Sequence, residues 1–364
     1  MSMRYEEVAR LRRGLKGGVS AVAFSPNGTF LATAGMKDAK VYIWRVDDSK
    51  LLHTYVGGDR PVLSLEWIPG RNDRVLCGSN DGYIFELKFD ADIYESSGFC
   101  AHGYPVERLA AKGSQLVSGA HREVSVWTQV RGAWRYQGDL LGPVADSQNA
   151  DEELIVVGIH WTKIKYYASV VVMTYMHHGI VIYNSHDWSR IHSIPFRDIG
   201  ASSMSPRGSL IALSIMGSGF DLYNLDTGDC AGSFSDESGR VRTVPVLFVH
   251  GGVAVLSGST IGRATLWNAS SQRVHQTFQP DPYDTILAID ANYNSELDRF
   301  LLAMGANDGA GESAVIVWLG REGSDRRKDV SWKQRMLTYA VRAVLATVVA
   351  VAALVISARV KIQL

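Results

Sequence analysis

The sequence predicts an all-β fold, a seven-bladed β-propeller, followed by a single C-terminal transmembrane α-helix. Two patterns in the 364-residue chain support this fold class. Short runs rich in β-branched and aromatic residues are separated by Gly, Pro, Asn and Asp, as in antiparallel strands joined by tight turns. These runs recur with a period of about forty residues, and a long uncharged run stands near the C-terminus.

The first unit shows the pattern of one blade. Its first strand is expected at Val19–Phe24, and the turn Ser25–Gly28 leads to a second strand at Phe30–Ala34. A second turn leads to a third strand at Lys40–Trp44, and Lys50–Tyr55 follows as a fourth. Each run alternates or is β-rich and each break carries turn residues, so four short antiparallel strands are predicted.

An aromatic residue near the end of each third strand marks seven such units. These residues are spaced 40 to 56 positions apart, close to the roughly 40–45 residues of a propeller blade. The markers are Trp44, Phe85, Trp127, Tyr183, Tyr223, Trp267 and Trp318. Seven units of four strands fit the radial arrangement of a propeller.

Several of these segments resemble WD-repeat blades. The resemblance is carried by Val22–Gly28, Leu31–Gly35 and Val41–Trp44 in the first unit, and by Ser203–Gly208 and Ala264–Asn268 later. It covers roughly residues 5 to 320. The resemblance implies a scaffold or adaptor that binds an unidentified protein or peptide on a propeller face, and no enzyme.

The chain departs from the WD pattern in two respects. The family's Gly-His start is not evident, and the Asp of the Trp-Asp pair is replaced in every unit. The replacements are Arg45, Glu86, Thr128, Asn184, Asn224, Asn268 and Leu319. The hydrogen-bonded Asp-His-Ser-Trp network of regular WD blades is therefore expected to be incomplete.

Ring closure requires a strand from the N-terminus. No fourth strand follows Trp318, whereas Tyr5–Leu11 stands directly before the first blade and is similar to the other fourth strands. We therefore expect residues 5–11 to complete the last blade, within a propeller spanning residues 1–319. Such closure removes an exposed sheet edge.

The C-terminal part is expected to anchor the chain in a membrane. A basic linker, 320–335, precedes an apolar run, 336–358, and a short tail, 359–364. The run is long enough to cross a hydrocarbon core of about 30 Å, although a buried helix of a soluble domain is the alternative. The expected membrane-interface residues are Arg326, Arg327, Lys328, Trp332, Lys333, Arg335, Arg342, Arg359 and Lys361.

The flanking charges predict the orientation of this anchor. The heavier basic flank precedes the span, which favours a cytosolic N-terminal domain on a single-pass protein. The basic linker either contacts anionic lipid of the bilayer or only sets topology. The endoplasmic reticulum and the mitochondrial outer membrane are both compatible with this segment.

Candidate partner-binding residues lie in the turns between second and third strands, which share one propeller face. They are Lys37, Asp38, Asn80, Asp81, His121, Arg122, His177, His178, Asn307 and Asp308. The alternative is that these are solvated turns. The acidic loop Leu140–Glu153 is either a further partner-binding loop or a tolerated surface insertion.

Composition and motif searches limit the other functions. With 37 basic and 37 acidic residues, the neutral balance argues against a nucleic-acid binder. Three scattered cysteines suit neither a disulfide framework nor a zinc site. No catalytic, metal or cofactor motif is present, so no catalytic residue, metal or cofactor is expected.

One alternative function comes from the layout of the whole chain. A cytosolic propeller before a membrane span is similar to the guanine-nucleotide exchange factor of the small GTPase that starts vesicle-coat assembly. That family carries a Gly-rich, ion-binding insertion in its first blade. The corresponding turn here, Gly35–Asp38, is tight.

Overall fold

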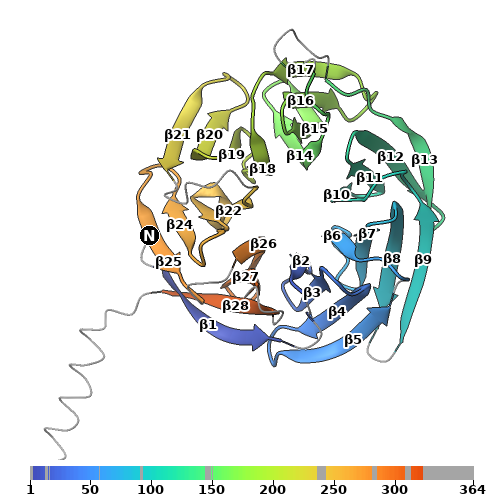
Figure 1. Cartoon of the computed structure of the whole chain (residues 1–364), viewed down its shortest axis with the longest axis vertical. Coiled ribbons are helices and arrows are strands. Elements are labelled where there is room, and N and C mark those ends of the chain that lie inside the picture. Colours follow the sequence, from blue (N-terminus) through green and yellow to red (C-terminus); the bar gives the residue numbers. More distant parts are fainter. Residues whose placement is uncertain are drawn as a thin grey trace, which may run out of the picture. The chain divides into compact units, whose positions relative to one another are not determined.

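The structure of the chain is a computed structural model. It describes residues 3–322, except 13–14, 16, 57, 91–92, 144–148, 150, 236–242, 281–284 and 308–312. Residues Tyr5–Gly320 form one compact unit. In this unit seven four-stranded sheets are arranged radially (Figure 1), which confirms the predicted all-β, seven-bladed propeller.

The first three blades follow one another along the chain. Blade 1 contains β2 (Val19–Phe24), β3 (Phe30–Gly35), β4 (Lys40–Arg45) and β5 (Lys50–Val56). Blade 2 contains β6 (Val62–Trp67), β7 (Arg74–Ser79), β8 (Tyr83–Phe89) and β9 (Tyr94–Cys100). Blade 3 contains β10 (Arg108–Lys112), β11 (Gln115–Ala120), β12 (Glu123–Val130) and β13 (Ala133–Asp139).

The remaining blades repeat this order. Blade 4 contains β14 (Val156–Ile164), β15 (Tyr167–Tyr175), β16 (Gly179–Asn184) and β17 (Arg190–Ile194). Blade 5 contains β18 (Ile199–Met204), β19 (Leu210–Ile215), β20 (Gly219–Asn224) and β21 (Cys230–Ser235). Blade 6 contains β22 (Val246–Val249), the 3₁₀ turn η1 (His250–Gly252), β23 (Ala254–Ser257), β24 (Ala264–Asn268) and β25 (Val274–Phe278). Blade 7 contains β26 (Thr285–Asn294), β27 (Arg299–Asn307), β28 (Ser313–Glu322) and β1 (Met3–Leu11).

The ring closes with a strand from the other end of the chain. The last sheet has the order β1-β28-β27-β26, so the N-terminal strand is its outermost member. In every blade the first strand lies nearest the centre of the ring and the fourth lies at the periphery (Figure 1). Closure leaves no blade without its outer strand, which limits exposed sheet edges.

A β-bulge accompanies the aromatic marker in five of the blades. The pairing of the third and fourth strands shifts register immediately before Trp44, Trp127, Tyr183, Tyr223 and Trp267. A bulge inserts one extra residue and increases the local twist of the pair. The recurring aromatic residue therefore marks the place where the outer strand carries one extra residue.

The expected marker of blade 2 is wrong by two positions. Leu31, the second residue of β3, pairs with Trp44, whereas the second residue of β7, Val75, pairs with Leu87. Leu87 therefore occupies the place that we expected for Phe85. The cause is that β8 continues to Phe89, so the aromatic pattern alone misplaced its end.

The hydrophobic cores lie between blades. Among the described residues, one cluster joins Leu31 and Trp44 of blade 1 to Ala303 and Val317 of blade 7. Other clusters join blades 1 and 2, 2 and 3, 3 and 4, 4 and 5, 5 and 6, and 6 and 7. Since each blade buries both faces against its neighbours, no blade has a complete core by itself.

The expectation of an incomplete polar network is wrong for blade 3. There Trp127 Nε1 donates to Ser118 Oγ at 2.9 Å, and Ser118 Oγ is 2.7 Å from His102 Nε2. His102 Nδ1 lies 3.2 Å from Glu123 Oε2. Glu123 thus stands in place of the expected Asp, and His102 precedes Gly103 where the WD pattern has His after Gly. These two differences concealed the motif in the sequence.

The other blades retain at most part of this network. In blade 1 Trp44 Nε1 donates to Thr33 Oγ1 at 3.0 Å, and no histidine completes the chain of bonds. In blades 6 and 7 the indole nitrogens of Trp267 and Trp318 are buried and make no hydrogen bond among the described residues. The prediction therefore holds for these three blades.

The predicted membrane anchor lies outside the part of the chain that the structure describes. Within the part of the chain that the structure describes, no helix is long and apolar enough to cross a membrane. The linker beyond Glu322, the span 336–358 and the tail 359–364 lie outside the described residues, as do all nine expected membrane-interface residues.

Candidate interaction surfaces

The expected partner-binding turns lie at the same end of their blades. Lys37 and Asp38 connect β3 to β4, and the exposed Asn80 and Asp81 connect β7 to β8. Asp38 Oδ2 accepts a hydrogen bond from Tyr42 at 2.8 Å, while its buried Oδ1 makes none among the described residues. The turn between β3 and β4 spans only residues 36–39, so no insertion enlarges it.

The turn of blade 3 is ordered by aromatic and ionic contacts. His121 stacks on Tyr104 with ring centroids 5.0 Å apart, and the guanidinium of Arg122 lies 5.3 Å from the centroid of the same ring. His121 Nε2 also lies 3.1 Å from the Glu153 carboxylate. Both predicted residues thus make defined side-chain contacts at the surface, in contrast to residues of a loosely solvated turn.

The acidic loop connects two of the expected turns. Its Glu153 binds His121 of blade 3, and Asn149 donates a hydrogen bond to the carbonyl of His177 in blade 4 at 3.3 Å. Asn149 is buried. The described part of this loop is therefore fastened across the turns of two blades, and residues 144–148 and 150 lie outside the description.

The remaining expected residues differ in their accessibility. His177 Nδ1 lies 3.4 Å from Asp198, whereas His178 is only 8 % exposed and offers little surface to a partner. Asn307 Oδ1 accepts the backbone N–H of Val19 at 2.8 Å, which links blade 7 to blade 1. Asp308 lies outside the described residues.

A cavity between two neighbouring blades was not among the expected sites. It has a volume of about 770 Å³ and lies between blades 1 and 2. Arg45 lines it at the end of β4, whereas the turn at Lys37 precedes that strand, so the cavity opens at the opposite ends of the strands from the expected turns. We call it the blade 1–2 groove.

The floor of the blade 1–2 groove is apolar. The rings of Phe30 and Phe89 meet edge to face with centroids 5.5 Å apart, and Leu52 lines the same space. Ile93 stands at the rim with 64 % of its surface exposed. An apolar floor with an exposed aliphatic side chain is the usual composition of a peptide or ligand site.

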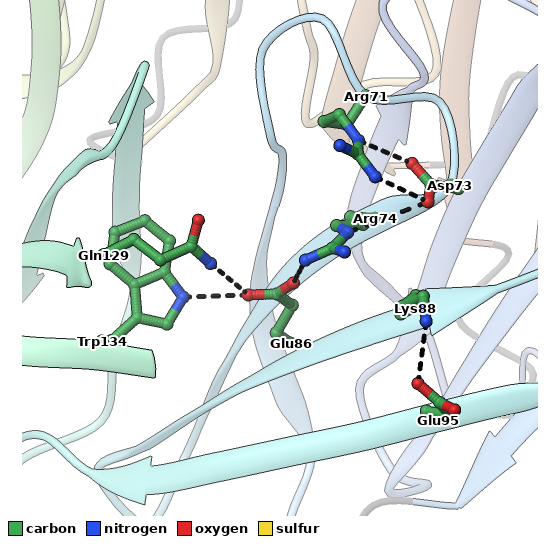
Figure 2. Close-up of polar contacts among 8 residues, drawn as sticks. All are labelled: Arg71, Asp73, Arg74, Glu86, Lys88, Glu95, Gln129 and Trp134. Atoms are coloured by element: carbon green, nitrogen blue, oxygen red, sulfur yellow. Dashed lines mark hydrogen bonds and ion pairs between the residues drawn. The ribbon is translucent and has the colours of Figure 1, made fainter. Parts of the chain in front are cut away.

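Two ion pairs lie at the rim of the groove. Lys88 binds Glu95 at 3.0 Å and Arg71 binds Asp73 at 3.1 Å (Figure 2). The hydrogen bond from Arg71 is the main reason that the pKa of Asp73 is lowered. These pairs hold the rim polar without a strong net charge, as in the rim of a protein interface.

Next to this rim, a buried glutamate joins blade 2 to blade 3. Glu86 is 6 % exposed and accepts from Arg74 Nη1 at 2.9 Å. Its other oxygen accepts from Gln129 Nε2 at 3.2 Å and from Trp134 Nε1 at 3.0 Å (Figure 2). A buried carboxylate requires such partners, so these contacts fix the relative position of the two blades.

Two further carboxyl groups link innermost strands. Glu66 on β6 accepts the backbone N–H of Ala111 in blade 3 at 3.2 Å. Asp290 on β26 accepts that of Phe24 in blade 1 at 2.6 Å. Burial is the main cause that raises the pKa of Glu66 to about 8, and the Asp290 charge contributes to this shift. Burial is also the main cause that raises the pKa of Asp290 to about 6.

Sequence reasoning missed the groove because its residues carry no motif. Phe30, Leu52 and Phe89 belong to three strands of two blades and meet only when the blades pack. The one available signal was Ile93, an aliphatic residue between polar neighbours before a short strand. That signal does not distinguish an exposed side chain from a buried one.

Comparison with known proteins supports the repeat assignment. Residues 8–45 match the family described as WD domain, G-beta repeat, which covers most of the first blade. The chain is 33 % identical over 84 residues to a WD repeat-containing protein 26 homolog of Arabidopsis thaliana. The match spans 22 % of this chain and 13 % of that relative's length. The fold and these matches together support a WD-repeat propeller.

Proposed function

We propose that this WD-repeat propeller is a protein-interaction scaffold whose blade 1–2 groove receives a segment of a partner protein. The observation that carries the proposal is the combination of an apolar floor and a pre-paired polar rim. The floor supplies area for a partner's apolar side chain, since burial of apolar surface provides most of the binding free energy. The paired rim avoids leaving a charge unpaired on binding.

The expected turns provide a second contact surface on the opposite face. Their support is the fastening of the acidic loop to His121 and His177, which gives the turns of blades 3 and 4 a defined shape. A scaffold with two distinct faces can hold two partners at once. The acidic loop then acts as part of the interface.

Affinity capture with paired variants of the full chain tests this function. Ile93→Asp places a charge at the rim of the groove, and Leu297→Asp places one at a similarly exposed aliphatic residue of blade 7, where 57 % of the surface is accessible. We expect a partner quantified by mass spectrometry to be lost with Ile93→Asp and retained with Leu297→Asp. Equal recovery with both variants contradicts binding in the groove.

We also infer that residues 336–358 tether the scaffold to a membrane with the propeller in the cytosol. The support is the length and apolar composition of the segment and the basic residues before it. A fluorescent protein at the N-terminus should label a membrane, the endoplasmic reticulum or the mitochondrial outer membrane. A diffuse signal contradicts the tether.

Guanine-nucleotide exchange is the alternative function, and its support is the layout of a propeller before a predicted span. The short turn at residues 36–39 lacks the insertion of the exchange-factor family. A nucleotide-release assay on the full chain with a vesicle-coat GTPase separates this alternative from a scaffold, which leaves the rate of release unchanged.

A further inference from the structure

A second cavity lies on blade 3, at the edge where β12 begins and β13 ends. It has a volume of about 450 Å³. Glu123 and Asp139 contribute two carboxylates to its wall, and Ser125 and Tyr136 line the space between the strands. It is separate from the blade 1–2 groove, whose lining residues belong to blades 1 and 2. We call it the blade 3 pocket.

The two carboxylates of the blade 3 pocket are held in place by neutral donors. Glu123 Oε2 accepts the backbone N–H of Gly103 at 3.0 Å and faces His102 Nδ1 at 3.2 Å. Asp139 Oδ1 accepts from Ser125 Oγ at 2.7 Å. These bonds orient both groups before any ligand arrives, which lowers the entropy lost on binding.

The basic side chain that faces these carboxylates is His102, next to Glu123. Among the described residues no Lys or Arg forms an ion pair with Glu123 or Asp139. Arg122, the residue before Glu123, lies over the ring of Tyr104. Burial is the main cause that lowers the pKa of His102, so this imidazole is neutral near pH 7 and leaves the Glu123 charge uncompensated.

An aromatic ring completes the wall between the charges. Tyr136 is 54 % exposed, and its ring packs edge to face on Trp127 with centroids 5.4 Å apart. A hydrogen bond to Asp139 is the main cause that raises the pKa of Tyr136, so its hydroxyl is directed at that carboxylate. A fixed, exposed aromatic face attracts cations through its quadrupole.

We propose that the blade 3 pocket binds the cationic side chain of a partner protein, an arginine in an exposed segment. The guanidinium forms charge-assisted hydrogen bonds to the carboxylates of Glu123 and Asp139 and lies against the ring of Tyr136. Arginine fits better than lysine because its planar fork reaches two carboxylates and stacks on an aromatic ring. This proposal rests on the scaffold function and adds the chemistry of one partner contact.

The pocket also couples the partner to the interior of blade 3. Glu123 is the outer member of the network that continues through His102 and Ser118 to Trp127. A partner arginine on Glu123 therefore extends a chain of hydrogen bonds that is already in place. Binding requires no rearrangement of the blade.

The test uses the full chain and two labelled peptides that differ at one residue. The first is Gly-Ser-Gly-Arg-Gly-Ser-Gly with an N-terminal fluorescein, and the second carries citrulline, which keeps the shape of arginine but lacks its charge. Fluorescence anisotropy should show binding of the arginine peptide and at least about ten-fold weaker binding of the citrulline peptide. Equal binding of the two peptides overturns the proposal.

Variants locate the binding in the pocket. Asp139→Asn and Tyr136→Ala should each weaken the arginine peptide by about ten-fold or more. The control Asp229→Asn with Glu296→Gln removes two exposed charges from turns of blades 5 and 7 and should leave the affinity unchanged. Loss of binding in the control alone, or unchanged binding in both pocket variants, contradicts the assignment.

Two further measurements keep the outcome specific. Melting curves of the pocket variants should match the unmodified chain, since both side chains are exposed. If calorimetry shows calcium binding that Asp139→Asn abolishes, and the arginine peptide does not bind, the pocket is a metal site. That result overturns the proposal. Failure of the Ile93→Asp capture experiment concerns the groove alone, because the peptide assay reads only the blade 3 pocket.

Discussion

The side-chain amide of Gln276 binds both backbone polar groups of Tyr5. Its Oε1 accepts the Tyr5 N–H at 2.9 Å and its Nε2 donates to the Tyr5 carbonyl at 2.8 Å. Gln276 thereby forms the two hydrogen bonds that a neighbouring strand would form, and it links the closing strand β1 to β25 of blade 6. The Tyr5 hydroxyl also lies 2.7 Å from His250 Nε2 in blade 6. Closure of the ring thus involves blade 6 as well as blade 7.

Replacing Gln276 by Ala should destabilise the ring. The backbone N–H and carbonyl of Tyr5, a residue that is only 4 % exposed, lose their hydrogen-bond partners. This loss should lower the free energy of unfolding by about 1–3 kcal/mol. Urea denaturation measures this difference. Gln137→Ala, at an exposed position of β13, is the matched control and should cost little. Equal stabilities of the two variants would show that the Gln276 contact is not needed.

Deleting residues 1–12 should lower the melting temperature more than Gln276→Ala does. The deletion removes the whole of β1 and leaves β28 as an unpaired outer edge, while Tyr5 and Leu11 leave their core clusters. The loss of these buried side chains and the loss of a row of strand hydrogen bonds both lower the stability of the fold. Differential scanning calorimetry gives the comparison, and an unchanged melting temperature is incompatible with strand closure.

Ser118→Ala should destabilise blade 3 more than Thr33→Val, which removes the hydroxyl and keeps the shape of the side chain, destabilises blade 1. Ser118 Oγ contacts both Trp127 Nε1 and His102 Nε2, so its loss leaves two buried groups without this partner, at about 2–3 kcal/mol. Among the described residues Thr33 Oγ1 accepts from Trp44 alone, which implies a cost of about 1 kcal/mol. Both residues are fully buried, which makes them a matched pair. Equal losses in chemical denaturation would argue against a complete network in blade 3.

Glu66 and Asp290 should make stability fall as the pH rises from about 5 to about 8, whereas the imidazoles of His160 and His250, whose pKa values burial lowers to about 4, act in the opposite sense up to about pH 6.5. The pKa of Glu66 is raised to about 8 and that of Asp290 to about 6, mainly by burial, so the folded chain holds protons that the unfolded chain releases at lower pH. Unfolding then releases protons, and higher pH favours it. Glu66→Gln, a neutral group of the same shape, should flatten this dependence and be relatively most stabilising near pH 8. Melting curves at several pH values decide, and an identical slope in both chains would contradict the raised pKa.

Glu86→Ala should cost about 3–5 kcal/mol, because it leaves Arg74, Gln129 and Trp134 without the buried carboxylate that they share. Glu95→Ala removes a carboxylate that is 70 % exposed and that pairs, among the described residues, with Lys88 alone (Figure 2), so it should have a small effect. Urea titrations of the two variants compare a buried link between blades with a surface ion pair. Similar losses would mean that Glu86 does not hold blade 2 to blade 3.

The fold was more predictable than the surface. The strand runs of blade 1, the turn at Ser25–Gly28 and the need for a closing strand follow from alternation and turn residues, which act within a few positions. The end of β8 was misplaced because Phe85 is aromatic while the residue at the marker position is Leu87. The network in blade 3 was missed because Glu123 and His102 depart from the usual residue type and order.

The sequence by itself determined the number of blades, the order of their strands and the residues that form each turn. These properties depend on hydrophobic alternation and turn geometry inside a single repeat, where neighbours in space are neighbours in the chain. Only the tertiary structure decided that Phe30 meets Phe89 in a groove and that Glu86 meets Trp134. These contacts cross from one blade to the next, so they depend on how the blades pack, and no local pattern encodes that arrangement.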